Sequence, residues 1–122
     1  MDPKISIITA CNNSFDTILY TINSIKSQSY KNIEHIIVDN RSNDGSLEIF
    51  KKYQSASQYH SIKLIIQRDK GIYDAINKGI LKATGKYICI LNSDDIFQSN
   101  RTLENVIKKI KNEHDISIFF LI

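Results

Sequence analysis

The sequence has few of the residues that mark several large classes of protein. Its four glycines are too far apart for the Gly-x-Gly-x-x-Gly pattern of dinucleotide-binding proteins. Its two cysteines lack the spacing of metal ligands and fall in or beside apolar runs. No apolar run approaches the roughly 20 residues that span a bilayer. These absences favour a globular domain with reduced core cysteines over a membrane protein, a disulfide scaffold or a zinc-binding module.

The charge is nearly balanced. Sixteen Lys and Arg against 13 Asp and Glu give a net charge of +3, and the lysines are scattered along expected helices. This excess is too mild to indicate nucleic-acid binding. Residues 1–5 lead directly into an apolar run, without the charged and apolar regions of a targeting sequence. We therefore expect a cytoplasmic protein, and peripheral association with the inner face of the membrane is compatible with that expectation.

Short β-branched runs alternate with stretches of helical periodicity along the whole chain. Strands are expected over 4–9, 33–38, 62–66, 87–91 and 116–122, and helices over 15–27, from 46 onward, over 72–83 and around 103–110. Strands that alternate with helices form parallel sheets with right-handed crossovers. The sequence therefore predicts one α/β domain, a Rossmann-like, mostly parallel sheet with helices on both faces.

The sequence also predicts structural roles for two glycines and the surroundings of two histidines. Gly79 lies inside a helix, where glycine costs about 1 kcal/mol relative to alanine, so a packing or binding reason is expected. Gly85 is expected to form the C-terminal cap of that helix. His35 alternates with apolar neighbours in a strand and is expected to be structural. His60 lies in a polar connector and is expected to face solvent.

Polar clusters follow four of the expected strands. They are Asn12 and Asn13, the run 39–44, the run 68–70 and the run 92–95. In an open parallel sheet, ligands bind outside the carboxyl ends of the strands, near the point where strand order reverses. The four clusters are therefore expected to meet along one edge of the sheet.

The adjacent carboxylates of Asp94 and Asp95 are the most informative of these groups. Taken alone, such a pair can be a polar turn that caps the next helix. Like charges held close together are easier to keep ionised beside a cation, and carboxylate oxygens suit Mg²⁺ or Mn²⁺. Asp39 can accept hydrogen bonds from a base or ribose, and Arg68 and Lys70 can balance phosphate charge. Together these groups predict a site for a nucleotide diphosphate and a divalent cation.

Five linked motifs resemble one family. They are Ser6-Ile-Ile-Thr9, the run 37–46 (IVDNRSNDGS), the run 69–79 (DKGIYDAINKG), the run 83–87 (ATGKY) and the run 91–95 (LNSDD). In this order and spacing the chain resembles the family 2 glycosyltransferases with the GT-A fold. The similarity is greatest to bacterial enzymes that build surface polysaccharides, and it covers almost the whole chain.

The resemblance implies roles for individual residues. It places the loop after Thr9 against the nucleotide base, Asp39 on uracil or its equivalent, and 92–95 at the DxD-type position, where Asn92 stands in place of a common first Asp. The residues implied in donor or nucleotide binding are Thr9, Cys11, Asn12, Asp39, Arg68, Asp69, Asn77, Asn92 and Asp94. The metal ligands implied for Mn²⁺ or Mg²⁺ are Asp94 and Asp95.

The resemblance also implies a reaction. A sugar passes from a nucleotide diphosphate, most often a UDP-sugar, to a hydroxyl of a saccharide or lipid-linked acceptor, in one inverting and metal-dependent step. Family members continue beyond this length into a part that binds the acceptor and supplies the general base. The 122 residues therefore match the nucleotide-sugar-binding part. A non-catalytic nucleotide-sugar-binding remnant or subunit is the alternative.

Overall fold

The structure is a computed structural model that describes residues 2–58 and 60–112. Strands and helices alternate without exception in this part of the chain. They are β1 (Ile5–Cys11), α1 (Ile18–Lys26), β2 (Ile33–Asp39), α2 (Ser46–Ala56), β3 (Ser61–Ile66), α3 (Ile72–Lys82), β4 (Tyr87–Ile90) and α4 (Thr102–Asn112). The strand expected over 116–122 lies outside the described residues.

The four strands form one parallel sheet in the order β3-β2-β1-β4. In the register, Ile8 of β1 pairs with Ile36 of β2 on one side and with Ile90 of β4 on the other. The chain adds β2 and β3 on one side of β1 and then returns to place β4 on the opposite side. Strand order therefore reverses between β1 and β4. The prediction of an α/β, Rossmann-like parallel sheet is confirmed.

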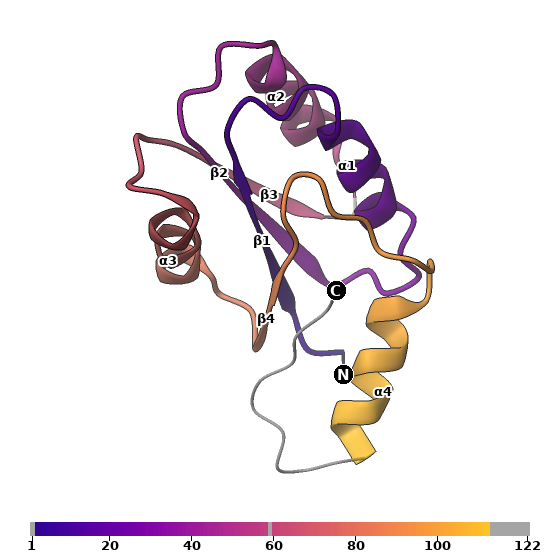
Figure 1. Ribbon diagram of the computed structural model, residues 1–122. Helices are drawn as coiled ribbons and strands as arrows, with labels where there is room; N and C mark the ends of the chain where they lie inside the picture. Colours follow the sequence, from indigo (N-terminus) through magenta and orange to yellow (C-terminus); the bar gives the residue numbers. More distant parts are fainter. Residues whose placement is uncertain (1, 59, 113–122) are drawn as a thin grey trace.

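Helices cover both faces of the sheet, with α3 on one face and α1, α2 and α4 on the other (Figure 1). Successive residues of a strand point to opposite faces. Accordingly, Ile8 packs in a cluster with Ala75 of α3, whereas Ile7 packs in a cluster with Leu103 of α4. A third cluster joins Ile37 of the sheet to α1 and α2. Because β1 and β2 are buried on both faces, they read as nearly continuous apolar runs.

Gly79 allows α3 to approach the sheet closely. A Cβ atom at this position would lie 2.6 Å from Cγ2 of Ile8 and 3.4 Å from Cγ2 of Val38. The expected packing reason for this glycine is therefore confirmed.

The expectation for Gly85 is wrong. Helix α3 ends at Lys82 and its C-cap is Ala83, in an extended conformation. Gly85 instead lies against β1, where its N–H donates to Oγ of Ser6 at 2.8 Å and an added Cβ would lie 2.6 Å from the same oxygen. Close approach to a neighbouring strand, rather than helix capping, requires glycine here.

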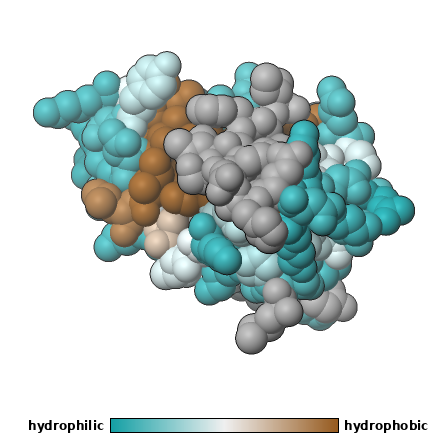
Figure 2. Space-filling model, turned by 90° about the horizontal axis from the view of Figure 1, so that it is seen from below, coloured by the Kyte–Doolittle hydropathy of each residue, from teal (hydrophilic) through white to brown (hydrophobic). Residues whose placement is uncertain are grey.

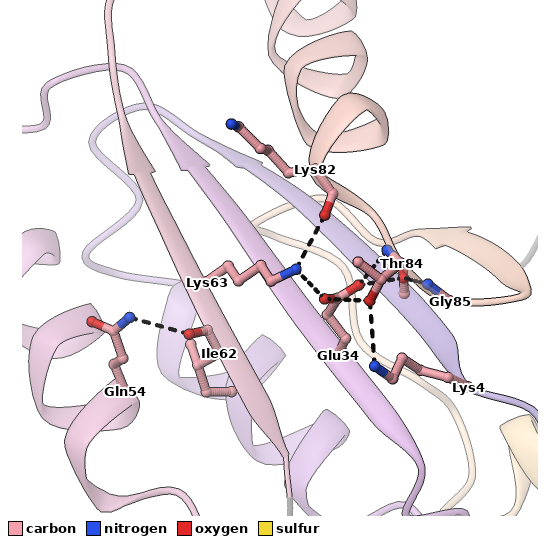
Figure 3. A network of polar contacts seen from close by, with 9 residues as sticks. Lys4, Glu34, Gln54, Ile62, Lys63, Lys82, Thr84 and Gly85 are labelled. Carbon is pink, nitrogen blue, oxygen red and sulfur yellow. Dashed lines mark hydrogen bonds and ion pairs between the residues drawn. The ribbon is translucent and has the colours of Figure 1, made fainter.

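A buried carboxylate ties the sheet together near the amino ends of its strands (Figure 3). Glu34 of β2 is 1% exposed, and it accepts hydrogen bonds from Ser6 Oγ (2.6 Å), Thr84 N (2.9 Å) and Thr84 Oγ1 (2.9 Å). Nζ of Lys63 lies 2.5 Å from its Oε1. Burial raises the pKa of Glu34, but the hydrogen bonds from Lys63, Ser6 and Thr84 outweigh it and bring the pKa to about 2. This network joins β1, β2, β3 and the segment before β4.

His35 is structural, as expected. It is fully buried, with Nε2 2.7 Å from Oγ1 of Thr9 and Nδ1 2.9 Å from the hydroxyl of Tyr53. Burial, with a smaller contribution from His60, lowers the pKa of His35 from 6.5 to about 3. The ring is therefore neutral and links two strands to α2.

The expectation that His60 faces solvent is wrong. Its side chain is only 8% exposed, and its backbone N–H donates to Oγ of Ser57 at 3.3 Å. Burial, and the nearby charge of Lys31, lower its pKa. The residue directly precedes β3, and its Nε2 is buried without a hydrogen-bond partner, which the polar connector around it does not reveal.

One face of the molecule carries a hydrophobic patch (Figure 2). Exposed apolar side chains in the described residues include Ile80 and Leu81 of α3 and Ile88 of β4. A helix long and apolar enough to cross a bilayer does not occur within the described ranges.

We predict that Gly79→Ala destabilises the chain although alanine favours helix formation. The new Cβ must displace Ile8 in a packed core, and such overpacking costs about 1–3 kcal/mol, against a propensity gain of about 1 kcal/mol. Urea unfolding should show a lower midpoint. Asn105→Ala, at an exposed helix position, is the control and should leave the midpoint nearly unchanged. A higher midpoint for Gly79→Ala would contradict the packing argument.

We also predict a loss of stability in acid that depends on His35. Its pKa is depressed in the folded state, so below about pH 6.5 the unfolded chain binds more protons than the folded chain. The free energy of unfolding should therefore fall as pH decreases from about 6.5 toward 3. His35→Gln should have a smaller slope of stability against pH in this window, whatever its absolute stability. An unchanged slope would show that His35 is not the group responsible.

Candidate functional site

A pocket of about 360 Å³ opens at the carboxyl edge of the sheet, where strand order reverses. Its wall is contributed by the exits of β1 and β2, the loop before α3 with the first turn of that helix, and the turn after β4. The lining residues are Ala10, Cys11, Asn12, Ser14, Asn40, Asp69, Gly71, Ile72, Ala75 and Ser93. The pocket is therefore where the expected polar strand ends meet.

The loop after β1 is fastened to the loop after β2. Asn13 has a left-handed backbone, with φ of 52°, and its N–H donates to Oγ of Ser42 at 2.8 Å. Its Oδ1 accepts a hydrogen bond from Asn43 N at 2.9 Å, and Asp44 accepts one from Phe15 N at 3.0 Å. These bonds across the two loops fix the segment that carries Cys11 and Asn12 into the pocket. Helix α1 begins at Ile18, later than expected, and residues 14–18 form a turn in which Thr17 N and Ile18 N both donate to the carbonyl of Ser14.

Asp39 lies beneath the surface of this edge. Its side chain is fully buried, and both its oxygens are held by Ser42, Oδ1 by the hydroxyl at 2.6 Å and Oδ2 by the backbone N–H at 2.7 Å. The next residue, Asn40, lines the pocket instead. The carboxylate expected to contact the base therefore also supports the loop around it.

The loop before α3 brings Asp69 to the pocket. Its Oδ1 accepts a hydrogen bond from Gly71 N at 3.0 Å, and its own N–H donates to Oδ1 of Asn40 at 3.1 Å. Gly71 has φ of 120°, which favours glycine. It leads into α3, so the electropositive start of an 11-residue helix lies at the pocket. Arg68 and Asn77 are exposed and do not line the pocket.

The turn after β4 is closed by its own residues. Asp95 N donates to the carbonyl of Asn92 at 3.0 Å, and Asn92 N donates to Oδ2 of Asp95 at 3.2 Å. This turn places Ser93 in the pocket wall and leaves the side chains of Asp94 and Asp95 exposed beside it. Oδ1 of Asn92 is buried without a hydrogen-bond partner.

A divalent cation fits the residues of this turn only with help from a ligand. No group of three or more His, Cys, Asp or Glu side chains that could hold a metal occurs in the ranges described. Asp94 and Asp95 offer two carboxylates on neighbouring residues, and Mg²⁺ is commonly held by one or two carboxylates together with substrate phosphates and water. The donor set therefore matches a cation that arrives with a diphosphate, rather than one resident in the free protein.

The structure brings together some of the predicted site residues and not others. Cys11, Asn12 and Asp69 line the pocket with Ser93. The predicted residues outside its wall are Thr9, Asp39, Arg68, Asn77, Asn92, Asp94 and Asp95. Thr9 is fully buried against His35, and so supports the site from below.

The sequence prediction missed several wall residues, among them Ser14, Asn40, Gly71 and Ser93. Asn40 and Gly71 belong to the polar strand exits, so their position after a strand was a usable signal. Ser14 and Ser93 face each other, with their Oγ atoms 2.6 Å apart. A single serine in a loop carries no pattern that would reveal such a contact.

The comparisons with solved structures agree with this arrangement. The first 349 residues of S. aureus TarS, in a structure with UDP-GlcNAc, match with a TM-score of 0.80 and 26% identity over 91% of this chain and 32% of that one. A mannosyltransferase of Pyrobaculum calidifontis, solved with GDP-Man and Mn²⁺, has a TM-score of 0.82 at 23% identity and covers 90% and 33% of the two chains. The fold is that of the GT-A glycosyltransferases.

The chain belongs to glycosyl transferase family 2, whose model matches residues 6–122. One relative is the amylovoran biosynthesis glycosyltransferase AmsB of Erwinia amylovora, which is 30% identical over 119 residues. The match covers 93% of this chain and 39% of AmsB. The family resemblance seen in the sequence motifs is confirmed, and the chain spans about two fifths of this relative.

We predict that Cys11 reacts slowly with alkylating reagents although it lines the pocket. Burial and the nearby charge of Asp39 raise the pKa of its thiol, and burial raises the pKa of Cys89 to about 12. Because the thiolate is the reactive form, both should be modified slowly at pH 8 and rapidly after unfolding. Mass spectrometry of iodoacetamide-treated protein checks this. Rapid labelling of Cys11 in the folded chain, with Cys89 still protected, would show that the pocket exposes the sulfur.

Proposed function

We propose that this chain is the donor-binding part of a glycosyltransferase that moves a sugar from a nucleotide diphosphate to an acceptor hydroxyl in polysaccharide synthesis. The observation that carries the proposal is the pocket at the reversal of strand order, with Cys11, Asn12, Asp69 and Ser93 in its wall. UDP-GlcNAc in the TarS structure supports a UDP-sugar as the donor.

The base and ribose would occupy the side of the pocket formed by β1 and β2. Asn12 and Asn40 offer amide donors and acceptors there, and Cys11 offers an apolar surface. Asp39, held by Ser42, has acceptor capacity beyond those two hydrogen bonds, because an ionised carboxylate has about four lone-pair sites. A base N–H that reaches Asp39 could therefore be accepted without replacing Ser42.

The diphosphate would lie between the start of α3 and the turn after β4. The backbone N–H groups in the first turn of a helix favour anions, and Ile72 and Ala75 bring that turn into the wall. Arg68 and Lys70, exposed in the preceding loop, would add positive charge nearby. Asp69 and Asn77 are proposed as donor contacts on the same side.

Asp94 and Asp95 would bind Mn²⁺ or Mg²⁺ together with the diphosphate oxygens, while Asn92 supports their turn. The Mn²⁺ present in the mannosyltransferase structure, which shares the fold, supports this assignment. A bound cation would stabilise the negative charge that develops on the departing diphosphate. The turn itself contributes by placing two carboxylates next to the pocket and not inside it.

The proposed transfer is a single inverting displacement by an acceptor hydroxyl. In the described part of the chain, Asp69 is the one carboxylate in the pocket wall, and its Oδ1 is engaged by Gly71 N. The proposal therefore assigns donor binding to this chain, and proton abstraction and acceptor binding to the rest of the whole protein. A saccharide or lipid-linked acceptor, and action at the cytoplasmic face of the membrane, are parts of the same proposal.

We predict that Mn²⁺ strengthens UDP binding and that Asp94→Asn or Asp95→Asn removes most of this gain. A hydrogen bond or ligand contact to a charged group contributes about 1.5–3 kcal/mol, so the loss should be roughly tenfold or more in affinity. Isothermal titration calorimetry with UDP, with and without Mn²⁺, measures it. Glu48→Gln, at an exposed position of α2, is the matched control and should bind like the wild type. Absence of UDP binding in both conditions would overturn the proposed function.

A further inference from the structure

We propose that Thr21 of α1 and Thr17, the N-cap residue of this helix, are positioning residues for the carboxylates of Asp94 and Asp95. Their hydroxyls hold the backbone of the turn that carries the two acids. This inference rests on the proposed function, because it concerns the metal-binding part of that site. Neither threonine lines the pocket or carries a charge that would contact a ligand.

The contacts converge on two carbonyl oxygens. Oγ1 of Thr17 donates to the carbonyl of Ser93 at 2.9 Å. Oγ1 of Thr21 lies 3.0 Å from the same oxygen and 2.6 Å from the carbonyl of Asp95. A hydroxyl has a single proton to donate. Thr17 therefore donates to the carbonyl of Ser93, and Thr21 donates to the carbonyl of Asp95, to which it makes its shorter contact. The two carbonyls flank Asp94, and the turn is therefore held on both sides of its central carboxylate.

The turn has few other restraints. Its own hydrogen bonds join Asn92 to Asp95, at 3.0 and 3.2 Å. Within the described ranges Asp94 makes no side-chain hydrogen bond or ion pair, and both acids are exposed. The direction of the Asp94 carboxylate is thus set by the backbone beneath it, whereas Asp95 is also held through its Oδ2 by Asn92 N. Thr21 is fully buried, so water cannot replace its hydroxyl when the hydroxyl is removed.

These threonines belong to a polar stripe that runs along one face of α1 and the turns just before and after it, which we call the α1 stripe. It comprises Ser14, Thr17, Thr21, Ser24 and Gln28, spaced by three or four residues as a helix face requires. Each member contacts the segment 93–103 that follows β4. The stripe is therefore a continuous polar seam between α1 and this segment.

The seam also connects the two sides of the pocket. Ser14 lies in the turn before α1 and lines the pocket, and its hydroxyl donates to Oγ of Ser93 in the opposite wall. The same loop is fastened to the loop after β2 through Asn13. Helix α1 thereby fixes the acidic turn relative to the loop that is proposed to contact the base.

The first test is independent of any ligand. Amide hydrogen exchange of the ligand-free chain, followed residue by residue with NMR, reports on the turn through the N–H groups of Asn92 and Asp95. Thr21→Val should raise their exchange rates roughly tenfold, the effect of leaving one buried carbonyl without its donor. Thr21→Ser, which restores the hydroxyl, should return the rates toward those of the wild type.

A matched control is available on the same helix face. Ser24 accepts a hydrogen bond from Phe97 N at 3.2 Å and does not contact the turn. Ser24→Ala should speed exchange at Phe97 and leave Asn92 and Asp95 unchanged. If Thr21→Val leaves the exchange of these two amides unaltered, the inference is overturned.

The second test measures metal use. UDP affinity is titrated against Mn²⁺ for the wild type, Thr21→Val and Thr21→Ser. Thr21→Val should raise the Mn²⁺ concentration for half-maximal effect roughly tenfold, by analogy with other residues that orient metal ligands, while metal-free UDP affinity stays the same. A role in general stability alone would instead weaken UDP binding with and without Mn²⁺.

The outcomes separate the two proposals. If Mn²⁺ strengthens UDP binding to the wild type and to Thr21→Val at the same concentration, the positioning role is wrong and the proposed function stands. If Mn²⁺ has no effect on the wild type, the metal site of the proposed function fails, and the positioning inference fails with it.

Discussion

The pairing of β1 on both of its edges is the constraint on which the rest of the structure depends. Its backbone bonds to β2 on one side and β4 on the other, and its side chains are buried on both faces from Ile5 to Thr9. Because both edges and both faces of β1 are covered, only its ends are open. The residues that follow β1 therefore emerge at the carboxyl edge of the sheet. The neighbouring exits lie beside it because the strands are parallel. The pocket is therefore a product of strand order, and its chemistry comes from the few residues that each exit adds.

Two polar networks hold this arrangement at opposite ends of the sheet. At the amino end, Glu34 gathers hydrogen bonds from β1, β3 and the segment before β4 (Figure 3). At the carboxyl end, the α1 stripe binds the segment after β4. The first surrounds a buried charge, which is costly unless it is well paired. The second consists of neutral hydroxyls and an amide that bond backbone groups and, in the case of Ser14, the hydroxyl of Ser93. Strand β4 has only four residues, so the polar contacts on both sides of it compensate for its short pairing with β1.

Much of the fold was predictable because its signals are local. The β-branched runs fixed three strands closely, and the isoleucines of α1 and α3 gave their helices. The polar strand exits located the edge of the sheet, and Cys11, Asn12 and Asp69, which were predicted to bind the donor, line the pocket there. What failed depended on contacts across the fold. His60 is buried although the connector around it is polar, and Gly85 is needed for its approach to Ser6. The α1 stripe did have a sequence signal, the spacing of hydroxyl residues between the isoleucines, but apolar periodicity alone does not reveal it.

The close contact at Gly79 has a consequence for the pocket as a whole. Gly79 lies four residues after Ala75, which lines the pocket, so at 1.5 Å per residue it is about 6 Å along the helix axis from the pocket wall. The side chains of Ile8 and Val38 that meet it belong to the two central strands. The contact therefore sets how closely α3 packs on the sheet. The first turn of the same helix forms one wall of the pocket. A methyl group at residue 79 would push α3 away from the sheet, and it would thereby change the width of the pocket although Gly79 is not part of the pocket wall.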